Sequence, residues 1–189
     1  MEMEISSDYE KHMNTHQLII NRTGIKCFDD FNNEGYSARA VLLYPPLSKF
    51  KINLVEHSKT KYSKEIDLKE NDAFTYYLYQ KTDNDASSVY AEIVVNEEVC
   101  NELCLTEQEL IAAVAHEVGH IIVYLRIGKD SLSVSMEELE SDLYACKMGL
   151  QKPLYSLLQK MYDSHLYSEE QETLFHKRLS YIKPANKML

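Results

Sequence analysis

Apolar residues recur along this chain with two different periods, and each period predicts a different kind of element. In segment 50–54 they alternate with polar residues, which is the pattern of a half-buried strand. Segments 74–80 and 89–95 are rich in aromatic and β-branched residues, and the polar stretch between them predicts an antiparallel hairpin. Segment 36–44, which two prolines follow, predicts another strand.

Helical spacing of apolar residues marks both ends of the chain and a long segment past its middle. A rough helical pattern runs over residues 8–21. Thr106 and Glu109 have the spacing of a capping box at the start of the long helix, and Gly128 is its predicted stop. Two further core-facing helices are expected within residues 154–182.

The composition is that of an ordinary soluble globular protein of 189 residues, with 44% hydrophobic and 26% charged residues. The formal net charge of −10 argues against nucleic acid as a partner, because phosphate binding requires a basic patch. The acidic start lacks the layout of a secretory signal, and no apolar run predicts an integral membrane segment. The four cysteines include no Cys-x-x-Cys pair. We expect reduced, buried thiols, which favour a cytoplasmic location.

Three polar residues interrupt the apolar segment 112–122 in the pattern His-Glu-x-x-His. Residues four apart lie on the same face of a helix, so His116 and His120 present their imidazoles together. Two imidazole nitrogens at this separation can hold one tetrahedral zinc ion. Glu117 is then placed to take a proton from a water molecule on the metal. Because burying three titratable residues is costly, a shared metal explains them better than three unrelated core positions.

Zinc held by two histidines needs a third protein ligand, and an acidic motif follows at a suitable distance. On a helix, Glu138 and Asp142 share a face that continues into two small residues, which let a partner helix approach closely. We interpret Glu138 as the third ligand and Asp142 as the carboxylate that orients a zinc-bound histidine. Glu137 and Glu140 are the alternative third ligands, although a solvated acidic face accounts for both.

Together the two motifs resemble those of the gluzincin metallopeptidases. Within that group, the pair of motifs is most similar to the HtpX, Oma and CAAX-prenyl-protease family, here in a minimal form without transmembrane helices or a long insertion. The resemblance covers residues 89–149. It implies a zincin-like α+β fold, in which a small antiparallel sheet packs on the active-site helix and further helices follow. It also implies that the preceding strand, with Ile93, Val94 and Val95, offers its edge to an extended substrate.

The same family often carries a late His-Pro and Arg pattern, in which the histidine can stabilise the oxyanion. In this chain His165 lacks the following proline, and His176 stands at an altered spacing before Lys177 and Arg178. Either histidine is therefore a candidate for that role. A solvent-facing helix position is the simpler interpretation of both.

The sequence thus predicts a zinc endopeptidase with one Zn²⁺ per chain, held by His116, His120 and Glu138, with Glu117 as general base. The expected partner is a peptide or protein substrate. Two alternatives stay open: a regulatory peptidase of a mobile element that cleaves one protein partner, and a non-catalytic zinc-binding protein of the same fold.

The predicted organisation is a single domain built in four parts. An N-terminal helix and loop span residues 1–35, and a β-rich part spans 36–98. The active-site helix spans 106–127, and a helical part with the third ligand spans 136–183.

Overall fold

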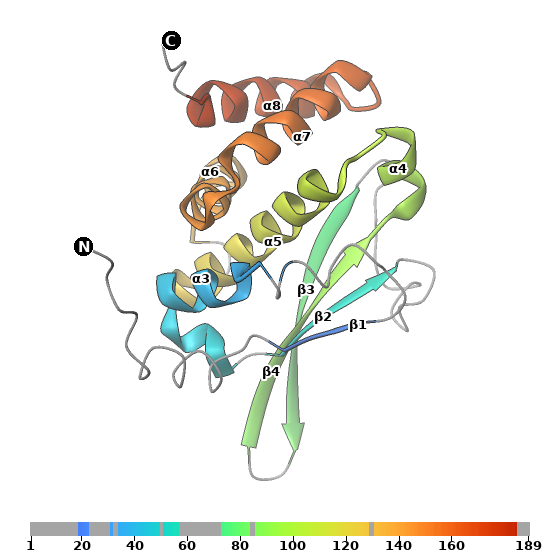
Figure 1. The fold of residues 1–189 in the computed structure, drawn as a ribbon. Helices are drawn as coiled ribbons and strands as arrows, with labels where there is room; N and C mark the ends of the chain where they lie inside the picture. Colours follow the sequence, from blue (N-terminus) through green and yellow to red (C-terminus); the bar gives the residue numbers. More distant parts are fainter. Residues whose placement is uncertain are drawn as a thin grey trace, which may run out of the picture.

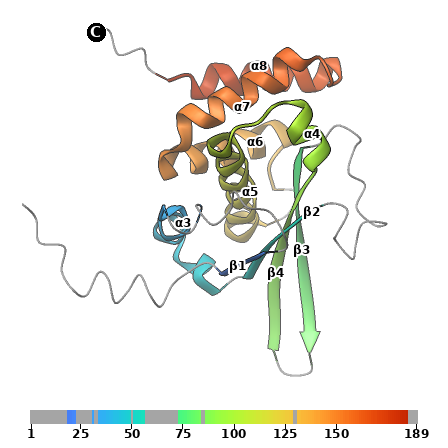
Figure 2. The same ribbon diagram turned by 45° about the vertical axis from the view of Figure 1, so that its right-hand side comes forward.

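A four-stranded sheet and a set of helices on one side of it make up the described part of the chain (Figures 1 and 2). The computed structural model describes residues 19–22, 31, 34–49, 51–56, 73–83, 86–128 and 131–184. In both views helix α5 lies between the sheet and helices α7 and α8. The expected mixture of helix and sheet is therefore confirmed.

The strands are β1 (Ile19–Arg22), β2 (Lys51–Glu56), β3 (Phe74–Asp83) and β4 (Ala86–Val95), in the order β1-β2-β4-β3. The predicted hairpin of β3 and β4 is confirmed, although both strands reach further into the polar segment than expected. The prediction of an antiparallel sheet is wrong, because β2 pairs in parallel with both β1 and β4. The sheet is mixed.

Strand β4 is an inner strand, which corrects the expectation that its edge receives a substrate. Ile93 is opposite Leu54 of β2 on one side and opposite Tyr76 of β3 on the other. Val94 and Val95 are likewise paired on both sides. The backbone groups of β4 are thus used within the sheet, and the described edge strand on this side is β3.

Two predictions in the first part of the chain also fail. Segment 36–44 contains helix α3 (Tyr36–Leu43), and the two prolines begin the 3₁₀ helix η2 (Pro45–Lys49). The buried residues of α3 are Ser37, Ala40 and Val41, a helical spacing that a short apolar run conceals. The predicted N-terminal helix ends in what is strand β1, and its residues 8–18 lie outside the described residues.

The second half is helical, as predicted. It consists of α4 (Glu97–Glu102), α5 (Glu107–Ile127), α6 (Val134–Ala145), a π-helical turn η4 (Cys146–Leu150), α7 (Gln151–Ser164) and α8 (Glu169–Ile182). At the start of α5 the capping box is present: the Thr106 side chain accepts from the Glu109 N–H, and the Glu109 carboxylate accepts from the Thr106 N–H at 2.6 Å. Gly128 ends α5.

The Glu109 carboxylate also joins α5 to α7. It accepts a hydrogen bond from Ser156 at 2.6 Å and pairs with the Lys160 ammonium at 2.7 Å. Burial opposes ionisation, but the bonds from Lys160, Ser156 and Thr106 prevail and lower the pKa of Glu109. One carboxylate thus stabilises the start of α5 and holds α7 beside it.

Helix α5 is the core helix of the protein. All its residues from Ile111 to Val123 are buried, including His116, Glu117 and His120. By length and composition alone α5 could cross a bilayer, but 72% of its most apolar window is buried inside the protein. Of the cysteines, Cys100 is buried as expected, whereas Cys104 is exposed.

Helices α5 and α6 pack closely together at Gly119. A Cβ atom there would lie 2.7 Å from the backbone oxygen of Ser141 and 2.8 Å from its Cα atom. Ser141 belongs to α6 and is completely buried. Because the neighbouring atoms are backbone, a side chain at Gly119 would push the two helices apart.

We expect Gly119→Ala to destabilise the protein by about 1–3 kcal/mol, because a methyl group there overpacks the helix crossing. At an exposed helix position, a change from glycine to alanine would stabilise the protein by up to about 1 kcal/mol. The sign of the stability change therefore shows whether the helix crossing is tight. Thermal or urea unfolding measures the effect. The control Gln108→Ala, at an exposed position of α5, should change stability by less than about 0.5 kcal/mol. A Gly119→Ala protein as stable as the wild type would contradict the tight crossing.

Candidate metal centre

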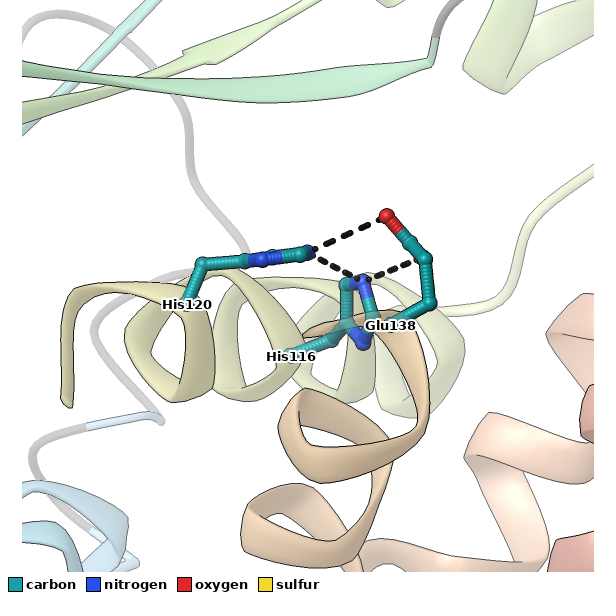
Figure 3. Close-up of side chains that lie close together, drawn as sticks. All are labelled: His116, His120 and Glu138. Atoms are coloured by element: carbon teal, nitrogen blue, oxygen red, sulfur yellow. Dashed lines mark hydrogen bonds and ion pairs between the residues drawn. The ribbon is translucent and has the colours of Figure 1, made fainter. Parts of the chain in front are cut away.

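Three side chains from α5 and α6 converge on one point (Figure 3). The Nε2 atoms of His116 and His120 lie 3.0 Å apart. The Glu138 carboxylate is 3.3 Å from His116 Nε2 through one oxygen and 3.4 Å from His120 Nε2 through the other. These residues form a group that could hold a metal ion.

The separations fit the geometry of a small tetrahedral ion. Ligand atoms about 2.0–2.1 Å from zinc at tetrahedral angles lie about 3.3 Å from one another. The two nitrogens are 3.0 Å apart, and each lies 3.3 or 3.4 Å from a different oxygen of Glu138, so these separations are close to this value. The donor set of two imidazoles and one carboxylate is also the set used by hydrolytic zinc sites, in which a fourth position stays open.

The other nitrogen of each imidazole meets a carboxylate. His116 Nδ1 lies 2.8 Å from Asp142, and His120 Nδ1 lies 2.9 Å from Glu137. These contacts favour the tautomer with its proton on Nδ1, so that the Nε2 lone pairs of both rings face the common point. The position of Asp142 is the one expected. Glu137, interpreted as part of a solvated acidic face, instead orients His120, because the crossing of α6 over α5 brings it there.

Arg178 of α8 completes the site, and sequence reasoning assigned it no role. Its guanidinium is buried and pairs with Glu138 at 2.7 Å. It also donates to both oxygens of Asp142, at 2.7 and 2.8 Å. Arg178 therefore links the candidate ligand Glu138 to the carboxylate that orients His116.

The sequence did contain a signal for Arg178. On α8 it occupies the same face as the buried apolar residues Phe175, Leu179 and Ile182. A charged residue in an apolar stripe requires a buried partner of opposite charge. Nothing local identifies that partner, because Asp142 is 36 residues away in the chain.

Glu117 is buried beside this group and lines the same cavity as His116 and Glu138. Burial raises the pKa of Glu117, against the opposing influence of the two imidazoles. A carboxylate with a raised pKa is a better proton acceptor than an ordinary surface glutamate. Its placement agrees with the predicted general base.

The electrostatics of the three candidate ligands favour a cation. Burial opposes the ionisation of Glu138, but Arg178 and the imidazoles hold the pKa of Glu138 well below its usual range. Burial likewise opposes a proton on His120, yet Glu137 and Glu138 raise the pKa of His120 to about 10. The site thus strongly attracts positive charge at the point that the two Nε2 atoms face.

The remaining candidates lie elsewhere. His165 is exposed and contacts Glu172 at 3.1 Å, and His176 is exposed on α8 near Tyr162. Neither histidine lines the cavity beside Glu117, so the structure does not support an oxyanion role for them. Glu140 is turned toward Arg126 at 3.6 Å, which agrees with its interpretation as part of a solvated face.

Comparisons of the chain with protein-family models, with curated proteins and with solved structures found no match. The resemblance to the gluzincins therefore rests on the motif residues themselves.

We expect near-stoichiometric zinc in protein purified without affinity metal or chelator, and a sharp loss of zinc in Glu138→Ala, which removes one of three ligands. Elemental analysis per chain measures the zinc content, and circular dichroism checks that the variant is folded. The matched control is Glu140→Ala, two residues away on the same helix, which should retain its zinc. Equal zinc in the two variants would show that Glu138 is not a ligand.

The loss of stability that rising pH causes in the metal-free protein should be offset when zinc is added. Without metal, the raised pKa of His120 means that its charged ring stabilises the fold below pH 6.5, and this contribution is lost as pH rises from 6.5 to about 10. Zinc requires the neutral ring, so stabilisation by zinc should grow over the same interval. Urea unfolding in chelator and in zinc measures both slopes, and His120→Asn should abolish the difference. If the stability of the wild type changed with pH at the same rate in chelator and in zinc, the linkage between His120 and zinc would be contradicted.

Proposed function

We propose that this protein is a zinc-dependent endopeptidase of the gluzincin type. The observation that carries the proposal is the convergence of His116, His120 and Glu138 next to a buried Glu117. Of these residues, His116, Glu117 and Glu138 line one cavity. A structural zinc site usually has four protein ligands and requires no base beside them. Three ligands with an adjacent carboxylate favour hydrolysis instead.

The chemistry that zinc supplies when bound is Lewis acidity, which polarises a carbonyl group and lowers the pKa of water toward neutrality. Glu117 takes the proton of the attacking water and passes it to the leaving amine. Asp142 and Glu137 hold the two imidazoles in orientation through their Nδ1 atoms. Arg178 holds the Glu138 and Asp142 carboxylates in place at 2.7 Å each.

Strand β3 is the edge on which an extended peptide would lie. Its first residue lies at the site, since Phe74 and the preceding Ala73 line the cavity together with Glu117 and Glu138. A substrate strand added there would gain main-chain hydrogen bonds with little demand on sequence. This replaces the assignment of the substrate edge to β4.

We expect Glu117→Gln to lower the hydrolysis of a peptide library by at least about 10²-fold, because the amide cannot accept the proton of the water. The variant should still bind zinc. The matched control Glu140→Gln should keep wild-type activity. Mass spectrometry of the products measures cleavage, and elemental analysis measures zinc.

Unchanged cleavage by Glu117→Gln would eliminate the mechanism. Zinc binding without cleavage by the wild type would leave the non-catalytic zinc-binding protein as the better explanation. Cleavage of one protein partner but not of the library would favour the regulatory peptidase.

A further inference from the structure

A cavity of about 160 Å³ opens beside the candidate metal centre, between α5, α7, α8 and the start of β3. One part of its wall is the site itself, with His116, Glu117, Glu138 and Arg178. The other part is apolar and comes from α7 and α8, with Leu154, Leu157, Leu158, Met161, Leu174 and Phe175. A group that fills the cavity therefore touches both an apolar wall and the residues of the site.

The apolar wall is part of the core. Leu154 and Leu158 are almost completely buried, and Leu157 and Phe175 nearly so. Helix α7 is tied to α5 by the bonds of its Ser156 and Lys160 to Glu109. The wall is thus preformed, and a ligand would not have to order it on binding.

The size and polarity of the cavity select its occupant. An engineered protein cavity of about 150 Å³ with a wholly apolar lining binds benzene, so a cavity of this volume admits a group of that size. The charged residues of this wall belong to the site, and Arg178 already pairs with Glu138 and Asp142. The other polar wall residues, Tyr167 and Gln171, are uncharged. Along the apolar wall from α7 and α8, a charged side chain would lose its hydration without gaining a partner, whereas a large apolar one would gain contacts.

We propose that this cavity binds a bulky apolar side chain, of leucine, methionine or phenylalanine size, next to the scissile bond of a peptide substrate. The inference rests on the proposed peptidase function, because Glu117 and Glu138 line the same cavity. It names the substrate class of that site: peptides with a large apolar residue adjoining the cleaved bond.

The first test measures binding apart from catalysis. Two hydroxamates with the same zinc-binding group, one with a benzyl and one with a methyl side chain, are titrated into zinc-loaded protein by calorimetry. We expect the benzyl compound to bind at least about tenfold more tightly, since each methylene in an apolar pocket contributes discrimination of this order. Equal affinities would overturn the proposal.

Filling the cavity from two sides tests its location. Leu174→Trp on α8 and Met161→Phe on α7 should each remove most of the preference for benzyl and leave zinc content and methyl hydroxamate affinity unchanged. Leu166→Trp, at a partly buried position outside this cavity, is the matched control and should keep the preference. A preference that persists in both filled variants would place the apolar subsite elsewhere and overturn the proposal.

A peptide library separates this inference from the proposed function. Cleavage enriched next to Leu, Met or Phe supports both. Cleavage without such enrichment overturns the apolar subsite while the peptidase function stands. No cleavage together with a clear benzyl preference supports the subsite as a ligand cavity and counts against the peptidase function.

Discussion

The close packing of α6 on α5 at Gly119 is the contact on which the site depends. With no side chain at Gly119, the backbone of Ser141 lies where a Cβ atom would otherwise be. Ser141 stands between Glu138 and Asp142, one helical turn from the first and next to the second. The approach of the backbones therefore brings both carboxylates within reach of imidazoles on the other helix. A wider crossing would leave two buried histidines without acidic partners, at a considerable cost in free energy.

Charge at this crossing is balanced from a third helix. The carboxylates of Glu138 and Asp142 meet the guanidinium of Arg178, which α8 inserts into the cluster. A buried ion pair stabilises a fold weakly in net terms, but removing one partner leaves an uncompensated buried charge. Because Arg178 belongs to α8, the Glu138 and Asp142 carboxylates keep their positions only while α8 is in place. The same helix supplies part of the apolar cavity wall, so one element sets both the electrostatics and the shape of the site.

The elements that short-range patterns could predict are those whose signals lie close together in the chain. The capping box of Thr106 and Glu109, the stop at Gly128 and the β3–β4 hairpin all depend on residues within a few positions or on one intervening loop. The predictions that failed concern features whose signals are weak or lie far apart in the chain. Helix α3 is too short for its period to be distinct, and the parallel pairings of β2 join segments that lie far apart in the sequence.

By itself, the sequence determined the local chemistry of the site. Spacings of four residues place His116 above His120 and Glu138 above Asp142, because helix geometry is the same wherever the helix lies. The tertiary structure alone decided which groups meet across elements: Glu137 with His120, Arg178 with Asp142, and β3 instead of β4 as the edge beside the site. The physical reason is that crossing angles and strand order arise from packing between distant segments, and no period within one segment encodes them.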